Sequence, residues 1–70
     1  MIKNGVYRHY KGNLYEVLSF AKHSETLEDM VVYKALYGDF GIWVRPMHMW
    51  DDEIVIDGKT VKRFMLIEMI

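Results

Sequence analysis

The chain has no cysteine and a single proline among its 70 residues. Without cysteine it can form neither a disulfide nor a thiolate metal site, and a secreted domain of this size usually carries such cross-links. We therefore expect a reducing, cytoplasmic environment. No apolar run approaches the ~20 residues of a membrane-spanning helix, and the N-terminal residues lack the apolar stretch of a signal peptide. These absences predict a soluble protein that does not enter a membrane.

The sequence also lacks an excess of either charge. Nine Lys and Arg residues face ten Asp and Glu residues, for a net charge of −1, which gives no overall preference for nucleic acid. The charges are nevertheless segregated: residues 1–24 and the segment from Lys59 onward are mostly basic, whereas residues 25–57 are mostly acidic. A barrel that joins the two ends of the chain is expected to have a basic side and an acidic side.

The composition is that of one folded domain covering residues 1–70. Hydrophobic residues make up 51% of the chain and aromatic residues 14%, which is typical of a globular protein and not of a disordered segment. A chain of this length buries only roughly 60% of its unfolded surface. The core is therefore expected to be thin, so that each large apolar side chain matters.

Short β-branched and aromatic runs alternate with turn residues, and no segment has a convincing helical pattern. Asp57-Gly58 between two β-branched runs predicts a type I′ hairpin, and Lys11-Gly12-Asn13 predicts another tight turn. The segment 47–53 is either an irregular connection or a single helical turn. The predicted strands cover residues 6–10, 14–21, 30–37, 42–45, 54–56, 59–61 and 63–67.

These elements predict an all-β fold, a small five-stranded SH3-like barrel made from a strongly bent antiparallel sheet, with at most one short helical turn. Ser19 is the predicted bend point in the long second strand. Closing the sheet would remove its unpaired edges. The alternative is an open, strongly bent sheet that is completed by dimerisation.

Five segments carry a resemblance to a known family. In order along the chain they are Tyr7-Arg8-His9-Tyr10-Lys11-Gly12-Asn13-x-Tyr15-x-Val17, then Ala21-x-His23-Ser24-Glu25-Thr26, Val31-Val32-Tyr33-x-x-Leu36-Tyr37-Gly38, Trp43-Val44-Arg45-Pro46 and Arg63-Phe64. Together they resemble a small bacterial family, domain of unknown function 1653, over nearly the whole chain. The resemblance implies a stand-alone bacterial domain and brings no activity with it. It also implies phenylalanine where this chain has Trp50, a difference that affects packing more than function.

The segment His23-Ser24-Glu25 contains the residue types of a hydrolytic triad. Adjacent residues point in different directions, whereas a triad needs its histidine between nucleophile and carboxylate. Loop capping, with Ser24 and Thr26 bonding nearby backbone, is the favoured interpretation. A small-molecule site or minor catalytic site on the His23-Ser24-Glu25-Thr26 loop remains the alternative. We assign no catalytic residue, no metal ligand and no cofactor, since the three histidines lack metal-binding spacing.

The aromatic residues are too many for so small a core. The set is Tyr7, Tyr10, Tyr15, Tyr33, Tyr37, Phe40, Trp43 and Trp50. In one arrangement Tyr15, Tyr33 and Trp43 are buried and the others line a homodimer contact. In the other, exposed aromatics form a groove beside arginines, as in modules that bind peptides or single-stranded nucleic acid.

We predict a non-enzymatic recognition module that binds nucleic acid or a peptide segment of a protein partner; an oligomeric structural domain is a further alternative. Arg45 is held extended by Pro46, as either a phosphate or carboxylate ligand or an ion-pair partner of Glu25 or Glu28. The predicted ligand-binding residues are Arg8, Tyr10, His23, Glu25, Trp43 and Arg45.

Overall fold

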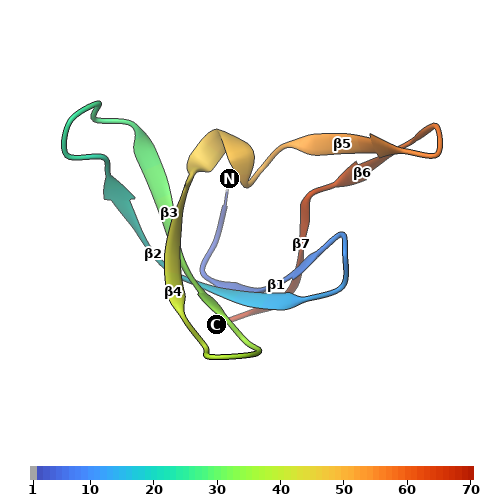
Figure 1. The fold of residues 1–70 in the computed structure, drawn as a ribbon, viewed down its shortest axis with the longest axis horizontal. Coiled ribbons are helices and arrows are strands. Elements are labelled where there is room, and N and C mark those ends of the chain that lie inside the picture. Colours follow the sequence, from blue (N-terminus) through green and yellow to red (C-terminus); the bar gives the residue numbers. More distant parts are fainter. Residues whose placement is uncertain (1) are drawn as a thin grey trace.

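The computed structural model describes residues 2–70 as a five-stranded antiparallel sheet and a separate two-stranded hairpin (Figure 1). The strand order in the sheet is β4-β3-β2-β1-β7, and β5 pairs only with β6. The elements are β1 (Gly5–His9), β2 (Leu14–Lys22), β3 (Asp29–Ala35), β4 (Ile42–Pro46), η1 (Met47–Met49), β5 (Glu53–Ile56), β6 (Lys59–Lys62) and β7 (Phe64–Met69). No helix in this part of the chain is long and apolar enough to cross a membrane.

The local predictions agree with these elements. Each predicted strand is present, with ends that differ by at most two residues. The single helical turn is the 3₁₀ turn η1, within the segment for which such a turn was one of two options. Asp57 and Gly58 both have positive φ, 50° and 78°, as the predicted type I′ turn requires. The ladder between β2 and β3 shifts register between Val17 and Ser19, next to the predicted bend point.

The sheet is all-β and antiparallel as predicted, but the closed SH3-like barrel is not found. Within residues 2–70, β4 pairs only with β3 and β7 only with β1, so these two strands are the free edges of an open sheet. Closure of this sheet would require β4 to pair with β7, which it does not, and β5 and β6 pair only with each other. The resulting hairpin projects away from the sheet (Figure 1).

Aromatic side chains form most of the core. Its members are Ile2, Tyr7, Val17, Val31, Tyr33, Trp50 and Phe64. Trp50, which follows η1, is 1% exposed and stacks on Phe64 with ring centroids 3.7 Å apart and planes at 1°. Tyr7 meets the same indole edge to face at 5.4 Å. The turn η1 thus positions the Trp50 indole at the centre of the bent sheet.

Trp43 does not belong to this core, contrary to the arrangement that placed it inside with Tyr15 and Tyr33. Its side chain is 61% exposed, whereas Tyr33 is buried and Tyr15 is half-buried. Trp43 lies opposite Tyr33 on the edge strand β4. An edge strand has a neighbour on one side only, so half of the packing around this indole is missing.

Candidate functional site

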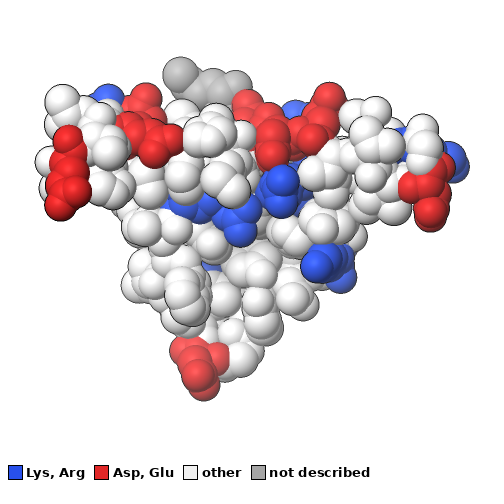
Figure 2. Space-filling view, turned by 45° about the horizontal axis from the view of Figure 1, so that its top comes forward, with Lys and Arg blue, Asp and Glu red and all other residues white. Residues whose placement is uncertain are grey.

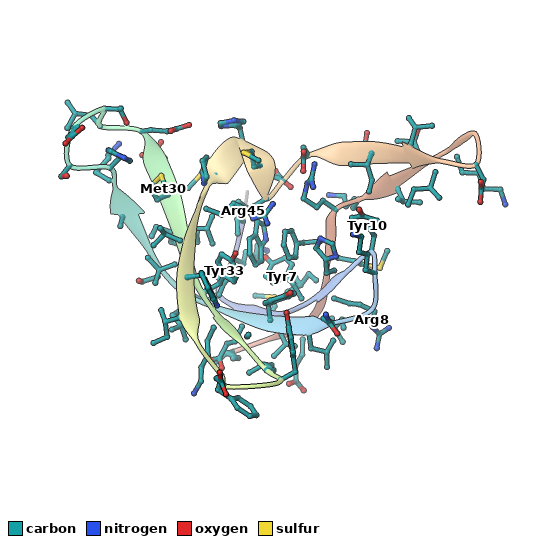
Figure 3. The ribbon with its side chains drawn as sticks, in the orientation of Figure 1. Tyr7, Arg8, Tyr10, Met30, Tyr33 and Arg45 are labelled. Atoms are coloured by element: carbon teal, nitrogen blue, oxygen red, sulfur yellow. The ribbon has the colours of Figure 1, made fainter. Side chains whose placement is uncertain are left out.

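The structure distributes the six predicted ligand-binding residues over three regions. Arg8 and Tyr10 lie at the end of β1 toward the β1–β2 turn, and Arg45 lies on β4, nearer the centre of the molecule (Figure 3). Trp43 is exposed on the same edge strand β4. His23 and Glu25 belong to the loop between β2 and β3, at the far end of the nine-residue strand β2, roughly 25–30 Å from the β1–β2 turn. These two residues therefore do not share a site with Tyr10.

Hydrogen bonds within the β2–β3 loop show what His23 does. Its Nδ1 accepts the backbone N–H groups of Glu25 and Thr26, at 3.2 and 3.3 Å. The Thr26 hydroxyl accepts the Glu28 N–H at 3.2 Å, which confirms the capping predicted for Thr26. With its Nδ1 engaged by two backbone N–H groups, His23 holds the loop backbone in place. The bonds support a structural role for this loop.

A groove lies between the hairpin β5–β6 and the adjoining ends of β1 and β7. Its volume is about 760 Å³. Apolar side chains, among them Tyr10, Ile56 and Met65, form much of its lining, while the cations include Arg8 and Lys62. The hairpin contribution was missed in the sequence analysis because residues 53–62 were expected in a barrel wall. No local signal in the sequence distinguishes a projecting hairpin from one that pairs with further strands.

A run of aromatic contacts connects this groove to Arg45. The rings of Tyr10 and His9 are 4.4 Å apart, and those of His9 and Phe64 are 4.9 Å apart. The Arg45 guanidinium lies over Phe64, 5.4 Å from its centroid. We call Tyr10, His9 and Phe64 the aromatic strip. Tyr10 is exposed and His9 is half-buried, but Phe64 is 5% exposed and belongs to the core, so these contacts link Tyr10 to Arg45 without forming one continuous exposed surface.

Arg45 does not form the ion pair with Glu25 or Glu28 that was one of its two predicted roles. Its Nη1 donates to the backbone oxygen of Met49 at 3.3 Å, and no carboxylate in residues 2–70 pairs with it. Glu28 contacts His48 instead, at 3.2 Å. The extended backbone before Pro46 directs the guanidinium toward Phe64, so it remains beside the aromatic strip.

The electrostatic environment of the strip is positive. Burial lowers the pKa of His9, and the nearby charges of Arg45, Lys11 and Arg63 lower it further. Arg63 is neutralised by a bidentate pair with Asp52, at 2.8 and 3.0 Å, and this pairing lowers the pKa of that carboxyl. For Arg45 and Lys11, by contrast, no ion pair is found among the described residues.

The charged side chains on the surface are also segregated by sign. Acidic side chains gather along one rim of the molecule, a band of basic side chains lies beneath it, and the surface below is mostly uncharged down to an acidic group at the lower tip (Figure 2). Glu28, Asp29, Asp51 and Asp52 line a shallow depression with His48. Across residues 2–70, no group of three His, Asp or Glu side chains is arranged to hold a metal ion.

The fold and site together define a small all-β domain: an open, bent antiparallel sheet with a projecting hairpin and an aromatic surface bordered by cations. The chain matches the family model described as "Protein of unknown function (DUF1653)" over residues 5–66. It therefore belongs to this family, as its motifs suggested.

One solved structure supports both the family and the fold. It is the crystal structure of a DUF1653 protein from Bordetella bronchiseptica, which is 34% identical in sequence and superposes with a TM-score of 0.88. The similarity covers 99% of this chain and 91% of that one. No curated protein matches the chain.

Proposed function

We propose that this domain is a non-enzymatic recognition module that binds single-stranded nucleic acid along the aromatic strip and the adjoining groove. The observation that carries the proposal is the run of aromatic contacts from Tyr10 through His9 to Phe64, which lies between cations that have no carboxylate partner within residues 2–70. Arg8 and Lys11 lie toward Tyr10, and Arg45 lies over Phe64. Nucleotides repeat a flat base and a negative phosphate, and proteins bind them with aromatic platforms beside Lys and Arg.

Each part of the surface has a role in this binding mode. Tyr10 is 38% exposed, with the Lys11 ammonium 5.7 Å from its ring centroid, so a base can stack there while a phosphate contacts Lys11. Arg45 uses one donor on the Met49 carbonyl, which fixes its direction, and its remaining N–H groups are free to donate to a second phosphate. The positive field at His9 favours an anion between them.

A peptide segment of a protein partner is the second candidate, and the groove itself favours it. Ile56, Val61 and Met65 give the groove apolar walls that would accept the side chains of an extended segment. The three cations along the same groove, Arg8, Lys59 and Lys62, outnumber its two carboxylates, Glu53 and Asp57, and so favour acidic residues in that segment. A small-molecule or catalytic site on the His23–Thr26 loop has less support, because His23 is engaged in capping.

The test is an amide chemical-shift titration of the labelled domain with short oligo(dT) and oligo(U), and separately with acidic peptides rich in phenylalanine. Saturable shifts on Arg8, Tyr10 and Arg45 that weaken as salt is raised would support nucleic-acid binding. The same shifts with the peptides but not with the oligonucleotides would show that this site binds a protein partner instead. Silence with all of these probes would overturn the proposed site.

A matched pair of variants tests the role of Arg45. Replacing Arg45→Met is expected to weaken oligonucleotide binding about tenfold, the equivalent of ~1.4 kcal/mol, with little change in melting temperature. Lys22→Met removes a cation of the same charge at the far end of β2, where it pairs with Asp29, and is expected to leave binding unchanged. A large loss of stability in Arg45→Met, with no specific loss of binding, would make Arg45 structural.

A further inference from the structure

The edge strand β4 is apolar and unprotected. Ile42, Trp43 and Val44 are consecutive, and their side chains are 63%, 61% and 58% exposed. Natural proteins usually blunt an edge strand with charges, bulges or proline, because its unpaired backbone groups invite another strand. In β4 the only charged residue is Arg45, and the proline is its last residue.

The backbone of β4 has unused hydrogen-bonding groups in a defined pattern. The Ala35 N–H donates to the Gly41 oxygen at 2.9 Å, which marks that pair as hydrogen-bonded. Bonded and non-bonded pairs alternate along an antiparallel ladder, so by the observed register Trp43 and Arg45 bond to β3. Ile42, Val44 and Pro46 consequently direct their backbone groups away from β3, toward solvent.

We propose that this edge is a self-association surface, on which β4 of a second copy pairs antiparallel about a two-fold axis at Val44. The two sheets then form one continuous ten-stranded sheet, five strands from each copy. In this register the two Val44 residues exchange N–H and C=O bonds across the axis. Ile42 lies opposite the partner's Pro46 and donates its N–H to that carbonyl. Pro46 has no N–H, so the return bond to the partner's Ile42 is missing. Because Pro46 is the last residue of the strand, the bonds between the two Val44 residues are unaffected.

Side-chain complementarity is what selects a second copy as the occupant. Directly opposed residues on paired strands share a face, so Trp43 meets the partner's Arg45, and the two-fold axis repeats the contact. An exposed indole beside a guanidinium is a favourable cation–π pair, and the Arg45 guanidinium would have to turn from Phe64 toward the partner's indole to form it, so the dimer and an oligonucleotide would compete for this side chain. Like charges do not meet in this register, since Arg45 is the only charge on the strand. The other edge strand, β7, has exposed apolar residues too but carries Glu68, and it serves as the control.

Sedimentation equilibrium of the full chain tests the proposal with one variant on each edge. The wild-type protein is expected to dimerise. Val44→Lys would place two like charges face to face on the axis and is expected to weaken the dimer at least about a hundredfold. Ile67 on β7 is 48% exposed in the monomer, and Ile67→Lys is expected to leave the dimer intact. A wild-type monomer at high concentration, or dissociation by Ile67→Lys but not by Val44→Lys, would overturn the proposal.

A cross-link tests the register even where a variant folds poorly. The chain has no cysteine, so one introduced thiol gives an unambiguous product. Hydrogen-bonded antiparallel partners have Cα atoms about 5.5 Å apart, within the span of a disulfide. Val44→Cys is therefore expected to form a disulfide-linked dimer on mild oxidation, and Ile67→Cys is not. The reverse result would contradict the assigned edge. Neither variant alters the aromatic strip, so this result is independent of nucleic-acid binding.

Discussion

Trp50 shows how one residue determines the centre of this small core. Its indole is 1% exposed, stacked on Phe64 and flanked by Tyr7 and Tyr33, yet within residues 2–70 its Nε1 has no hydrogen-bond partner. A buried donor without an acceptor costs about 1–3 kcal/mol. Packing of the ring must offset this cost, so the ring and its N–H group contribute to stability with opposite signs.

Two substitutions separate these contributions. Trp50→Phe keeps a stacked ring and removes the unpaired donor, so we expect a loss of about 1 kcal/mol or less in the free energy of unfolding. Trp50→Ala empties the centre of the core and is expected to cost about 3–5 kcal/mol, enough to unfold much of the protein. Urea unfolding followed by circular dichroism measures both values. Equal losses would show that the indole N–H contributes favourably.

At the scale of single elements, Gly5 illustrates a constraint between β1 and β7. A Cβ on this residue would lie 2.4 Å from the Glu68 backbone oxygen, at a point where the two strands shift register. Gly5→Ala is therefore expected to force the strands apart and to destabilise the protein by more than ~2 kcal/mol. Gly38→Ala is the matched control, because that glycine also has positive φ but open space around it. Thermal unfolding should give Gly5→Ala a much lower melting temperature than Gly38→Ala.

The hairpin β5–β6 is held to the sheet at its base. Arg63 donates its N–H to the Asp52 oxygen at 3.1 Å, and its side chain forms the bidentate pair with the same residue. The Tyr10 N–H donates to the Arg63 oxygen at 3.0 Å, which links this base to the end of β1. An isolated two-stranded hairpin is marginal in water, so these bonds are expected to decide whether the groove keeps its shape.

Hydrogen exchange can test this clamp. Asp52→Asn removes the charge-assisted pair and is expected to increase amide exchange of residues 53–62 roughly fivefold, the equivalent of about 1 kcal/mol, with β2 and β3 unaffected. Asp51→Asn is the control, because the Asp51 contact with Lys62 is 3.9 Å long and exposed. Equal acceleration in the two variants would show that the bidentate pair does not hold the hairpin.

The difference between what the sequence predicts and what the structure shows arises at the scale of the whole molecule. The hairpin at Asp57-Gly58, the turn at residues 47–49 and the bend near Ser19 depend on local chemistry, and each was predictable. Which strands meet is a non-local property: nothing near residues 53–62 indicates that they leave the sheet open. Tyr10 and Arg45 were each predicted as ligand-binding residues, but their spatial relation could not be derived from the sequence for the same reason. Their connection through His9 and Phe64 depends on the pairing of β1 with β7.

The stability of the whole domain is expected to fall on acidification in two separate pH windows. The pKa of His9 is lowered in the folded protein, chiefly by burial and then by Arg45. The unfolded chain therefore binds this proton more readily, and stability is lost as the pH falls from the ordinary histidine value through the lowered one. The pKa of Asp52 is lowered chiefly by its hydrogen bonds from Arg63. Its contribution is present above the ordinary aspartate value and is lost as the pH falls through the lowered one.

Melting temperatures measured from neutral to strongly acidic pH, at constant ionic strength, test this expectation. His9→Gln should flatten the decline in the window just below the ordinary histidine pKa and leave the acidic window unchanged. Asp52→Asn should flatten only the acidic window, because it removes the carboxyl whose ionised form Arg63 stabilises. Arg45→Met should narrow the upper window by moving its acidic end to higher pH, since it removes a positive charge that lowers the pKa of His9 in the folded protein. An upper window that does not narrow in Arg45→Met would mean that Arg45 does not act on His9. The positive field assigned to the aromatic strip, which is one of the arguments for an anionic ligand, would then have to be withdrawn.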